Sequence, residues 1–242
     1  MKDSIRCIIN ADDFGLSESV NQAIVRSFFS GYITSASIMV GMPGFHEAVA
    51  LAKEHALLNA IGIHLNVTEG YPTTEIIKRI PSLVDNNGLF RFLVSRSSLH
   101  LPPAYVAALH AEFSCQIETC IQAGITPTHI DSHHHIHNVW PVGAIVIDLA
   151  QKYRIPAVRI ARNFGPGISF TKWIFKTFYN LRLRYHGIAR TDLMGSFSDY
   201  IKQPPAPHLS VEIMVHPVLI NGTIIDSMEN EVLSHLIEKT LS

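Results

Sequence analysis

Short apolar runs alternate along the chain with longer segments in which apolar residues recur every three or four positions. The short runs are typical of buried strands, and the longer segments are typical of helices that cover a sheet. About seven such alternations occur, without a sequence repeat. The expected strands are Cys7–Ile9, Ser35–Val40, Ala60–Val67, Thr128–His137, Ala157–Ala161, Thr191–Gly195 and Val211–Pro217.

The expected helices have recognisable ends. Ser17 can cap a helix that carries Glu18 in its first turn and Gly31 just past its last turn. The other expected helices run from Pro43-Gly44 to about Lys53, from Pro102-Pro103 to Gly124, over Trp140–Tyr153 and Ser169–Tyr185, and from about Ser227 onward.

The alternation breaks over residues 68–101. Within this stretch Asn87-Gly88 separates two apolar pairs, Leu83-Val84 and Leu89-Phe90, which predicts a small hairpin. Insertions of this length usually cover a site or are disordered. We therefore expect a single domain over residues 1–242 with an insertion at about 68–101.

Alternating strands and helices indicate parallel βαβ units, which build either a barrel or an open doubly wound sheet. No G-x-G-x-x-G follows the first strand and there is no P-loop, so a nucleotide-binding sheet has little support. Polar residues at or just past the carboxyl ends of expected strands favour a barrel, because barrel enzymes place catalytic groups there. They are Asp12, Asp13, His64, His133 and His216. We expect an α/β fold with about seven parallel strands in a barrel.

Composition narrows the classes of partner. Hydrophobic residues make up 47% of the 242 residues, enough for a large core, and 19 basic against 20 acidic residues give a formal charge of −1. This balance provides no basic excess to attract nucleic acid or anionic lipid. The N-terminus lacks the apolar region of a secretory signal, and no run is long enough to span a membrane. The three cysteines show no zinc-type spacing. We expect a cytoplasmic protein.

The densest chemistry lies in Thr128–His137, where five of the 14 histidines fall within nine residues beside Asp131. An expression tag is a poor explanation, because the run is internal and Ile136 interrupts it. Buried imidazoles need partners, and metal coordination and catalysis both supply them. If the run is extended, alternation places one set of polar side chains on a single face. That set is His129, Asp131, His133, His135 and His137.

The remaining candidates are weaker when each is taken alone. Asp12-Asp13 would ordinarily be a turn or capping pair, although the apolar strand before it favours a site with one carboxylate as metal ligand and the other as base. A lone His64 or His216 is more often structural, and each gains weight only from its position at a strand end. One carboxylate and two imidazoles form a common ligand set for a divalent ion.

These motifs together carry a resemblance to a known family. Asn10-Ala11-Asp12-Asp13-Phe14-Gly15, Gly62-Ile63-His64-Leu65 and the histidine run resemble the YdjC-like carbohydrate deacetylases, and Pro81–Asp85 and Val215-His216-Pro217 fit the same pattern. The likeness extends from the first strand to His216. Two departures are visible: residues 164–207 carry no alignable motif, and members of this family usually continue into a further strand after the last helix.

The resemblance implies a distorted TIM-like (β/α) barrel that hydrolyses the acetamido group of a sugar. By the resemblance, Asp13, His64 and His133 hold one divalent metal ion, Mg²⁺ or Zn²⁺. Asp12 then corresponds to the general base and His216 to the general acid. Arg159 is expected to orient Asp12, and Asp131, His129 and His135 are expected to support the ligands or face the substrate.

The expected function is therefore removal of an N-acetyl group from an amino sugar, in an oligosaccharide or glycolipid, to give acetate and a free amine. One alternative is a metal-dependent phosphoesterase, which is disfavoured because related hydrolase barrels carry His-x-His on their first strand. Another is a non-catalytic sugar-binding protein on the same scaffold. The sequence identifies neither the acetylated sugar nor the oligomeric state.

Overall fold

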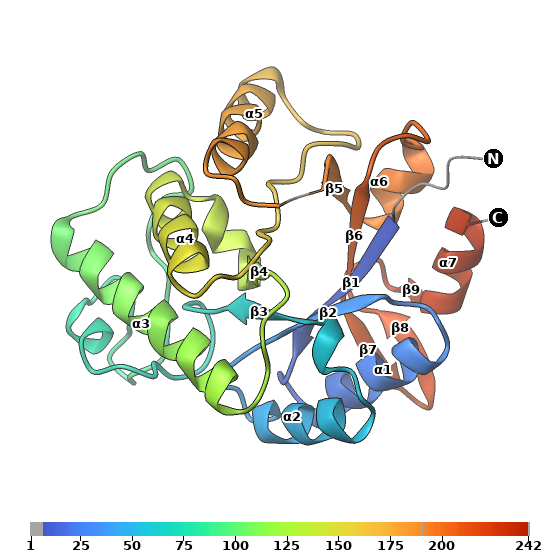
Figure 1. The fold of residues 1–242 in the computed structure, drawn as a ribbon, viewed down its shortest axis with the longest axis horizontal. Helices are drawn as coiled ribbons and strands as arrows, with labels where there is room; N and C mark the ends of the chain where they lie inside the picture. The colour runs from blue at the N-terminus through green and yellow to red at the C-terminus, as the bar shows by residue number, and fades with distance from the viewer. Residues whose placement is uncertain (1–6, 190, 242) are drawn as a thin grey trace.

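The computed structural model describes residues 7–189 and 191–241, so the N-terminal hexapeptide on which the signal-peptide expectation partly rests lies outside the described residues. Its central feature is a six-stranded parallel sheet with the order β4-β3-β2-β1-β6-β5 (Figure 1). The strands are β1 (Cys7–Phe14), β2 (Ser35–Ile38), β3 (Ile61–Leu65), β4 (Ile130–Ser132), β5 (Leu193–Gly195) and β6 (Val211–Val215).

The sheet curls into a half-barrel, which confirms the expected α/β fold and is consistent with a distorted TIM-like barrel. The fifth expected strand, 157–161, forms only single parallel bridges, from Val158 to Ile130 on one side and from Ala157 to Ala189 on the other. A further hydrogen bond runs from Asn163 N to Met194 O. The segment therefore links the two edges of the sheet without being a regular strand.

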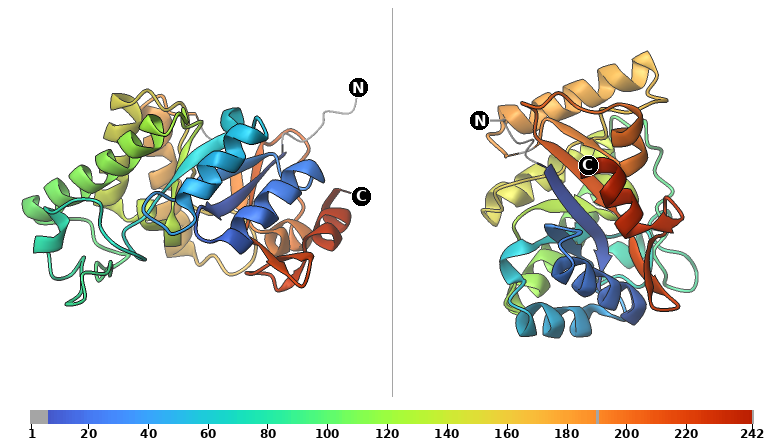
Figure 2. Two further views of the ribbon diagram at one scale, coloured as in Figure 1. Left: turned by 90° about the horizontal axis from the view of Figure 1, so that it is seen from below. Right: turned by 90° about the vertical axis from the view of Figure 1, so that its right-hand side faces the viewer.

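Seven helices of the described chain lie outside the sheet, as the two views of Figure 2 show. Ser17 accepts a hydrogen bond from Val20 N and caps α1, as the sequence predicts, and Pro103 occupies the first turn of α3. The helices are α1 (Glu18–Phe29), α2 (Phe45–Glu54), α3 (Pro103–Gln122), α4 (Trp140–Lys152), α5 (Phe170–Tyr185), α6 (Phe197–Lys202) and α7 (Leu233–Leu241). In the described chain, no helix combines the length and the hydropathy that crossing a bilayer requires.

The stretch between β3 and α3 is ordered by buried contacts. The predicted hairpin is reduced to one antiparallel bridge between Val84 and Phe90, next to a short 3₁₀ helix, Ile77–Arg79. Ile77 and Leu83 are fully buried, and the buried carboxylate of Glu112 on α3 accepts hydrogen bonds from the backbone of residues 73 and 74. This stretch is therefore packed against the core and against α3.

The end of the chain differs from the expectation. Three antiparallel strands, β7 (Pro217–Ile220), β8 (Thr223–Asp226) and β9 (Glu231–Val232), precede α7, so the expected helix starts at Leu233 and not near Ser227. Asn221-Gly222 forms the turn between β7 and β8, with φ of 49° and 81°. This turn needs left-handed backbone at both positions, which asparagine and glycine adopt most readily.

Candidate metal centre

The carboxyl end of β1 presents both aspartates from one distorted strand. The pairing with β2 shifts register between Ala11 and Phe14, and Asp13 has a φ of 70°, which is rare for a residue with a side chain. Asp12 and Asp13 are both buried, at 1% and 8% exposure. The bulge turns two adjacent carboxylates toward the same end of the barrel, although a regular strand would point them to opposite faces.

His64 lies on β3 beside this bulge and is held from behind. Its Nδ1 lies 2.7 Å from Asp131 Oδ1, and its Nε2 lies 3.2 Å from Asp13 Oδ1. Ser37 on β2 donates to the second oxygen of Asp131 at 2.9 Å. Because the Asp131 carboxylate can only accept, the imidazole donates through Nδ1 and directs Nε2 toward Asp13.

The histidine run is not an extended strand, so the expected single polar face over 129–137 is wrong. Strand β4 ends at Ser132, and His133–Asn138 forms a 3₁₀ turn in which His134 and His135 have φ near 50°. These left-handed residues end the alternation of side chains. His133 points toward Asp13, whereas His134 is exposed and contacts Thr68.

Asp13, His64 and His133 converge. Asp13 Oδ1 lies 2.9 Å from His133 Nδ1 and 3.2 Å from His64 Nε2, and these three residues form one of the groups able to hold a metal ion. Ligands about 2.0–2.2 Å from a single ion stand roughly 3.0–3.5 Å apart in tetrahedral or octahedral arrangements. The chemistry and spacing of the three donors therefore fit one divalent ion.

The electrostatics of this group favour a positive charge at its centre. Burial by itself raises the pKa of Asp13, but hydrogen bonds from His133 and His64 outweigh burial and lower that pKa well below its usual value. Burial by itself lowers the pKa of His64, but the charge of Asp131 and hydrogen bonds to Asp13 and Asp131 raise it to about 10. Without a metal ion, the carboxylates of Asp13 and Asp131 keep His64 protonated and positively charged. A bound metal ion would supply positive charge at the same place.

Arg159 links three carboxylates inside the barrel. Its two terminal nitrogens donate to both oxygens of Asp12, at 2.6 and 2.7 Å, and Nη2 also lies 2.8 Å from Asp131. Its Nε donates to Glu212 at 2.5 Å. Burial alone raises the pKa of Asp12, but the guanidinium charge outweighs burial and lowers it. Arg159 therefore fixes the orientation of Asp12 and keeps it ionised.

His216 lies where β6 ends and β7 begins. Its Nε2 is 3.8 Å from Asp12 Oδ2, and the buried carboxylate of Asp226 accepts a hydrogen bond from its backbone N–H at 3.0 Å. Its Nδ1 is buried and has no hydrogen-bond partner among the residues that the structure describes. The ring thus stands beside Asp12 with a free nitrogen.

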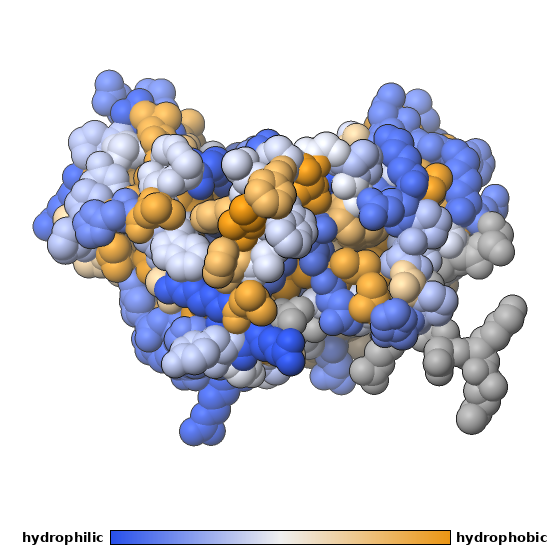
Figure 3. Space-filling view, turned by 90° about the horizontal axis from the view of Figure 1, so that it is seen from above, coloured by the Kyte–Doolittle hydropathy of each residue, from blue (hydrophilic) through white to orange (hydrophobic). Residues whose placement is uncertain are grey.

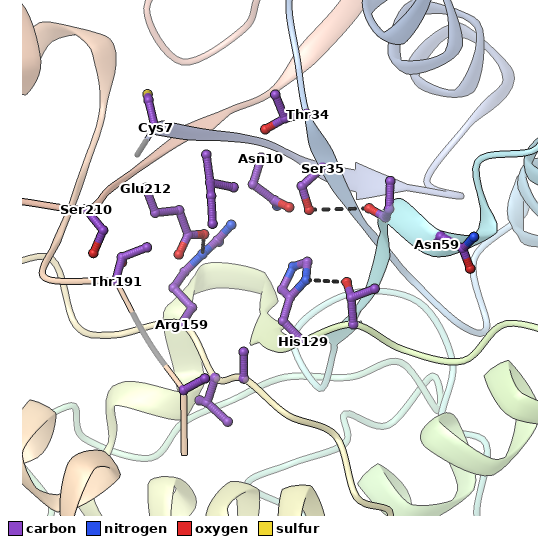
Figure 4. A pocket seen from close by; sticks show the side chains of 16 residues that line it. Cys7, Asn10, Thr34, Ser35, Asn59, His129, Arg159, Thr191, Ser210 and Glu212 are labelled. Carbon is purple, nitrogen blue, oxygen red and sulfur yellow. Dashed lines mark hydrogen bonds and ion pairs between the residues drawn. The ribbon is translucent and has the colours of Figure 1, made fainter. Parts of the chain in front are cut away.

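The other candidates in the histidine run lie apart from the ligand group. His129 is at the opposite end of β4, where it lines a cavity of about 640 Å³ with Arg159 and Glu212 (Figure 4). His135 is partly buried near Asp12 and Arg159, and the loss of solvent around its ring lowers its pKa to about 4. This cavity therefore lies at the amino ends of the strands, away from the group of Asp13, His64 and His133.

Several residues of the site were not singled out in the sequence. Glu69, from the stretch before α3, places Oε1 3.4 Å from His133 Nε2. Ser37 and Asp226 support His64 and His216, and Glu212 is the third partner of Arg159. Only Glu212 has a visible signal, since it interrupts the apolar run of β6.

Comparison with known proteins identifies the family. The family model described as YdjC-like protein matches residues 6–238. The chain belongs to the YdjC-like family. It is 44% identical over 219 residues to a protein of Geobacillus stearothermophilus named carbohydrate deacetylase, covering 89% of this chain and 80% of that one. A Brevibacillus brevis protein of the same name is 38% identical over 221 residues, 91% of this chain and 84% of the relative.

A solved structure supports the fold of this YdjC-like chain. It comes from Enterococcus faecalis V583 and is named for cellobiose-phosphate cleavage. The two structures superpose with a TM-score of 0.70 at 25% identity, over 99% of this chain and 91% of the other. The curled sheet with its C-terminal antiparallel extension is therefore an arrangement that a solved relative also adopts.

Proposed function

We propose that this YdjC-like protein is a metal-dependent hydrolase that removes the N-acetyl group from an acetylated amino sugar, giving acetate and a free amine. Relatives up to 44% identical are named carbohydrate deacetylase, which supports the reaction class. The observation that carries the proposal is the convergence of Asp13, His64 and His133 beside Asp12 and His216. This combination supplies three ligands, a carboxylate and a proton donor within one end of the barrel.

One divalent ion, Zn²⁺ or Mg²⁺, would be held by Asp13, His64 and His133. Two imidazoles with one carboxylate suit zinc and related ions, whereas magnesium ordinarily prefers oxygen ligands. When bound, such an ion polarises the acetyl carbonyl and lowers the pKa of a coordinated water. Asp131 orients His64 for this task, since it fixes the proton on Nδ1 and leaves Nε2 as the ligand atom.

Asp12 would accept the proton of the attacking water. Its bidentate pair with Arg159 lowers its pKa, so the carboxylate is ionised at neutral pH and ready to accept. The same pair makes Asp12 a weak base, so the water must be acidified before Asp12 can take its proton. Arg159 would also return Asp12 to one orientation after each turnover.

His216 would donate a proton to the departing amine. An amide nitrogen leaves poorly as an anion, so cleavage needs a proton source on the side of the leaving group. His216 is the strand-end imidazole nearest Asp12, and its Nδ1 has no hydrogen-bond partner within the described chain. The Asp226 carboxylate fixes its backbone by accepting from the His216 N–H.

The test is a panel assay on the full chain, stripped with chelator and reloaded with Zn²⁺ or Mg²⁺. N-acetylated mono- and oligosaccharides, free and phosphorylated, would be scored for acetate, with p-nitrophenyl phosphate as a phosphoester probe. The name of the Enterococcus faecalis relative is the reason to include phosphorylated sugars. Metal-dependent acetate release from at least one sugar is expected, and Asp148→Asn on α4 is an exposed control that should keep full activity.

Two outcomes would contradict the proposal. Phosphate release without acetate would make the chain a phosphoesterase built on the same metal group. Saturable binding of an acetylated oligosaccharide with metal present, and no acetate from any sugar in the panel, would make it a binding protein. Either outcome would exclude N-deacetylation but would still be compatible with a metal ion held by Asp13, His64 and His133. The metal content of the protein is therefore measured in parallel.

A further inference from the structure

Helix α5 exposes an apolar face. Five large hydrophobic side chains of this 16-residue helix project from the surface, with between 48% and 87% of their area accessible. They are Phe170, Trp173, Phe178, Leu181 and Tyr185. Figure 3 looks down on the side of the molecule where α5 lies, and hydrophobic side chains gather across the middle of that face.

The exposed side chains share one side of the helix. At 100° per residue, the positions 170, 178, 181 and 185 fall within about a quarter turn of one another, with Trp173 at the edge of the stripe. Of the buried residues of α5, Tyr179 and Leu183 lie on the opposite side, and Asn180 lies next to Trp173. A helix that packs on a globular core normally buries its apolar stripe and exposes polar residues. Helix α5 does the reverse on its outer face, because large apolar side chains are exposed there.

The charge around this face is positive. No Asp or Glu occurs between residues 149 and 191, whereas nine of the 19 Lys and Arg residues lie there. Four of them, Lys172, Lys176, Arg182 and Arg184, belong to α5 itself. The formal charge of −1 for the whole chain therefore conceals a basic segment. At 100° per residue, Arg182 and Arg184 border the exposed apolar stripe, whereas Lys172 and Lys176 lie on the other side of the helix.

We propose that α5 docks the protein on the surface of an anionic lipid bilayer, lying in the plane of the interface with its apolar stripe in the headgroup region. Interfacial helices combine aromatic and aliphatic residues on one face with Lys and Arg beside them, and they bind through both. Trp173 and Tyr185 are residue types that prefer this depth. Neither the reaction nor the metal is required for this docking.

A second copy of the chain is a poorer occupant of this face. An isologous dimer through α5 places the same patch opposite itself. Arg182 and Arg184, which border the stripe, would then lie close to the same residues of the other helix, and α5 contains no acidic residue to pair with them. Anionic headgroups remove this repulsion, because they supply the opposite charge along the whole helix.

Two hydrogen bonds, one buried and one partly buried, join the helix to the end of the barrel that carries the proposed metal group. Tyr179 Oη donates to the carbonyl of His137 at 2.7 Å, and Arg182 donates to the carbonyl of Trp140 at 3.0 Å. His137 belongs to the turn that carries His133. A bilayer that held α5 would thus hold this turn at a fixed orientation to the surface.

The test is co-sedimentation of the full chain with vesicles of phosphatidylcholine alone and with about one third phosphatidylglycerol. The chain should bind the anionic vesicles at least tenfold more strongly, and binding should weaken as salt is raised. Trp173 fluorescence should shift to the blue on binding, and the shift should be lost in Trp173→Phe. Phe178→Ser and Lys172→Glu/Arg184→Glu should each reduce binding about tenfold or more.

Phe29→Ser is the matched control, since Phe29 is 67% exposed but lies on α1. It should leave vesicle binding unchanged. Far-ultraviolet circular dichroism of each variant shows that loss of binding is not loss of fold. Equal sedimentation with neutral and anionic vesicles would overturn the proposal, as would unchanged binding in the α5 variants. A dimer in light scattering that Phe178→Ser dissociates would instead assign the face to a second copy.

Discussion

The carboxylate of Asp131 lies 2.7 Å from Nδ1 of His64, and this contact sets what the opposite nitrogen of the ring can do. With a proton fixed on Nδ1, Nε2 faces Asp13 at 3.2 Å and is the nitrogen that would ligate a metal ion. Both side chains are almost completely buried, so water does not compete for the hydrogen bond. The pair is therefore the support on which the proposed metal group depends.

Asp131→Asn tests this support. The amide can present N–H to His64 and favour the wrong tautomer, so metal affinity should fall about 10–100-fold. Competition with a chromophoric zinc chelator measures it. Glu212→Gln is the matched control, because it also alters a partner of Arg159 but does not touch His64. Equal zinc affinity in Asp131→Asn and the parent would remove Asp131 from this role.

Arg159→Met should be strongly destabilising. It leaves Asp12, Asp131 and Glu212 buried without their shared cation, and breaking a buried pair costs about 3–5 kcal/mol. Urea unfolding measures the change, and Glu212→Gln added to Arg159→Met should recover part of it. Lys78→Met, which breaks an exposed pair with Glu75, should cost less than about 1 kcal/mol. If Arg159→Met also costs less than about 1 kcal/mol, the three carboxylates do not depend on the Arg159 charge for their stability in the fold.

Asp12→Asn should abolish most turnover and keep the metal. Loss of a general base costs about 10²–10⁴-fold in rate, whereas Asp12 is not among the three proposed ligands. Acetate release and metal content by plasma emission measure the two effects on the same sample. Acetate release close to that of the parent would exclude Asp12 as the base.

Acid should destabilise the chain through His137. Its backbone N–H donates to Ser132 Oγ, and the same oxygen lies 2.5 Å from His137 Nδ1, so the ring is held in place inside the fold. Burial lowers the pKa of His137 well below its usual 6.5. The unfolded chain therefore binds this proton more readily, so the stabilisation is complete above pH 6.5 and is lost as the pH falls below it.

His137→Phe should flatten that pH dependence. The phenyl ring fills a similar space but takes up no proton, so the free energy of unfolding should fall less steeply between about pH 6.5 and 5 than in the parent, by up to about 1.4 kcal/mol per pH unit. Urea unfolding at several pH values measures the slope. The exposed His208→Gln should not change it. Parallel slopes for parent and His137→Phe would place the acid sensitivity elsewhere.

Local sequence signals predicted much of the fold. The Ser17 cap and the Pro102-Pro103 start gave helix ends close to those observed, because these residues act on their own backbone. The grouping of Asp13, His64 and His133 was also accessible, since the carboxyl ends of parallel strands meet at one end of a barrel. Their roles as ligands remain predictions.

Other features depend on contacts or backbone that the strand pattern does not reveal. His134 and His135 adopt left-handed conformations that end β4 early, and a period-two reading of the histidines assumes the opposite. Arg159 joins residues from β1, β4 and β6 that only the curling of the sheet brings together. The antiparallel pair β7–β8 was not predicted, because the expectations for this end of the chain ended with the strand Val211–Pro217 and resumed at Ser227.

The metal group is tested most directly by anomalous diffraction from crystals of the full chain grown with Zn²⁺. We predict one strong anomalous peak within about 2.0–2.2 Å of a carboxylate oxygen of Asp13, Nε2 of His64 and a ring nitrogen of His133. A peak held by other residues, or no peak at that position in crystals that contain zinc elsewhere, would contradict it.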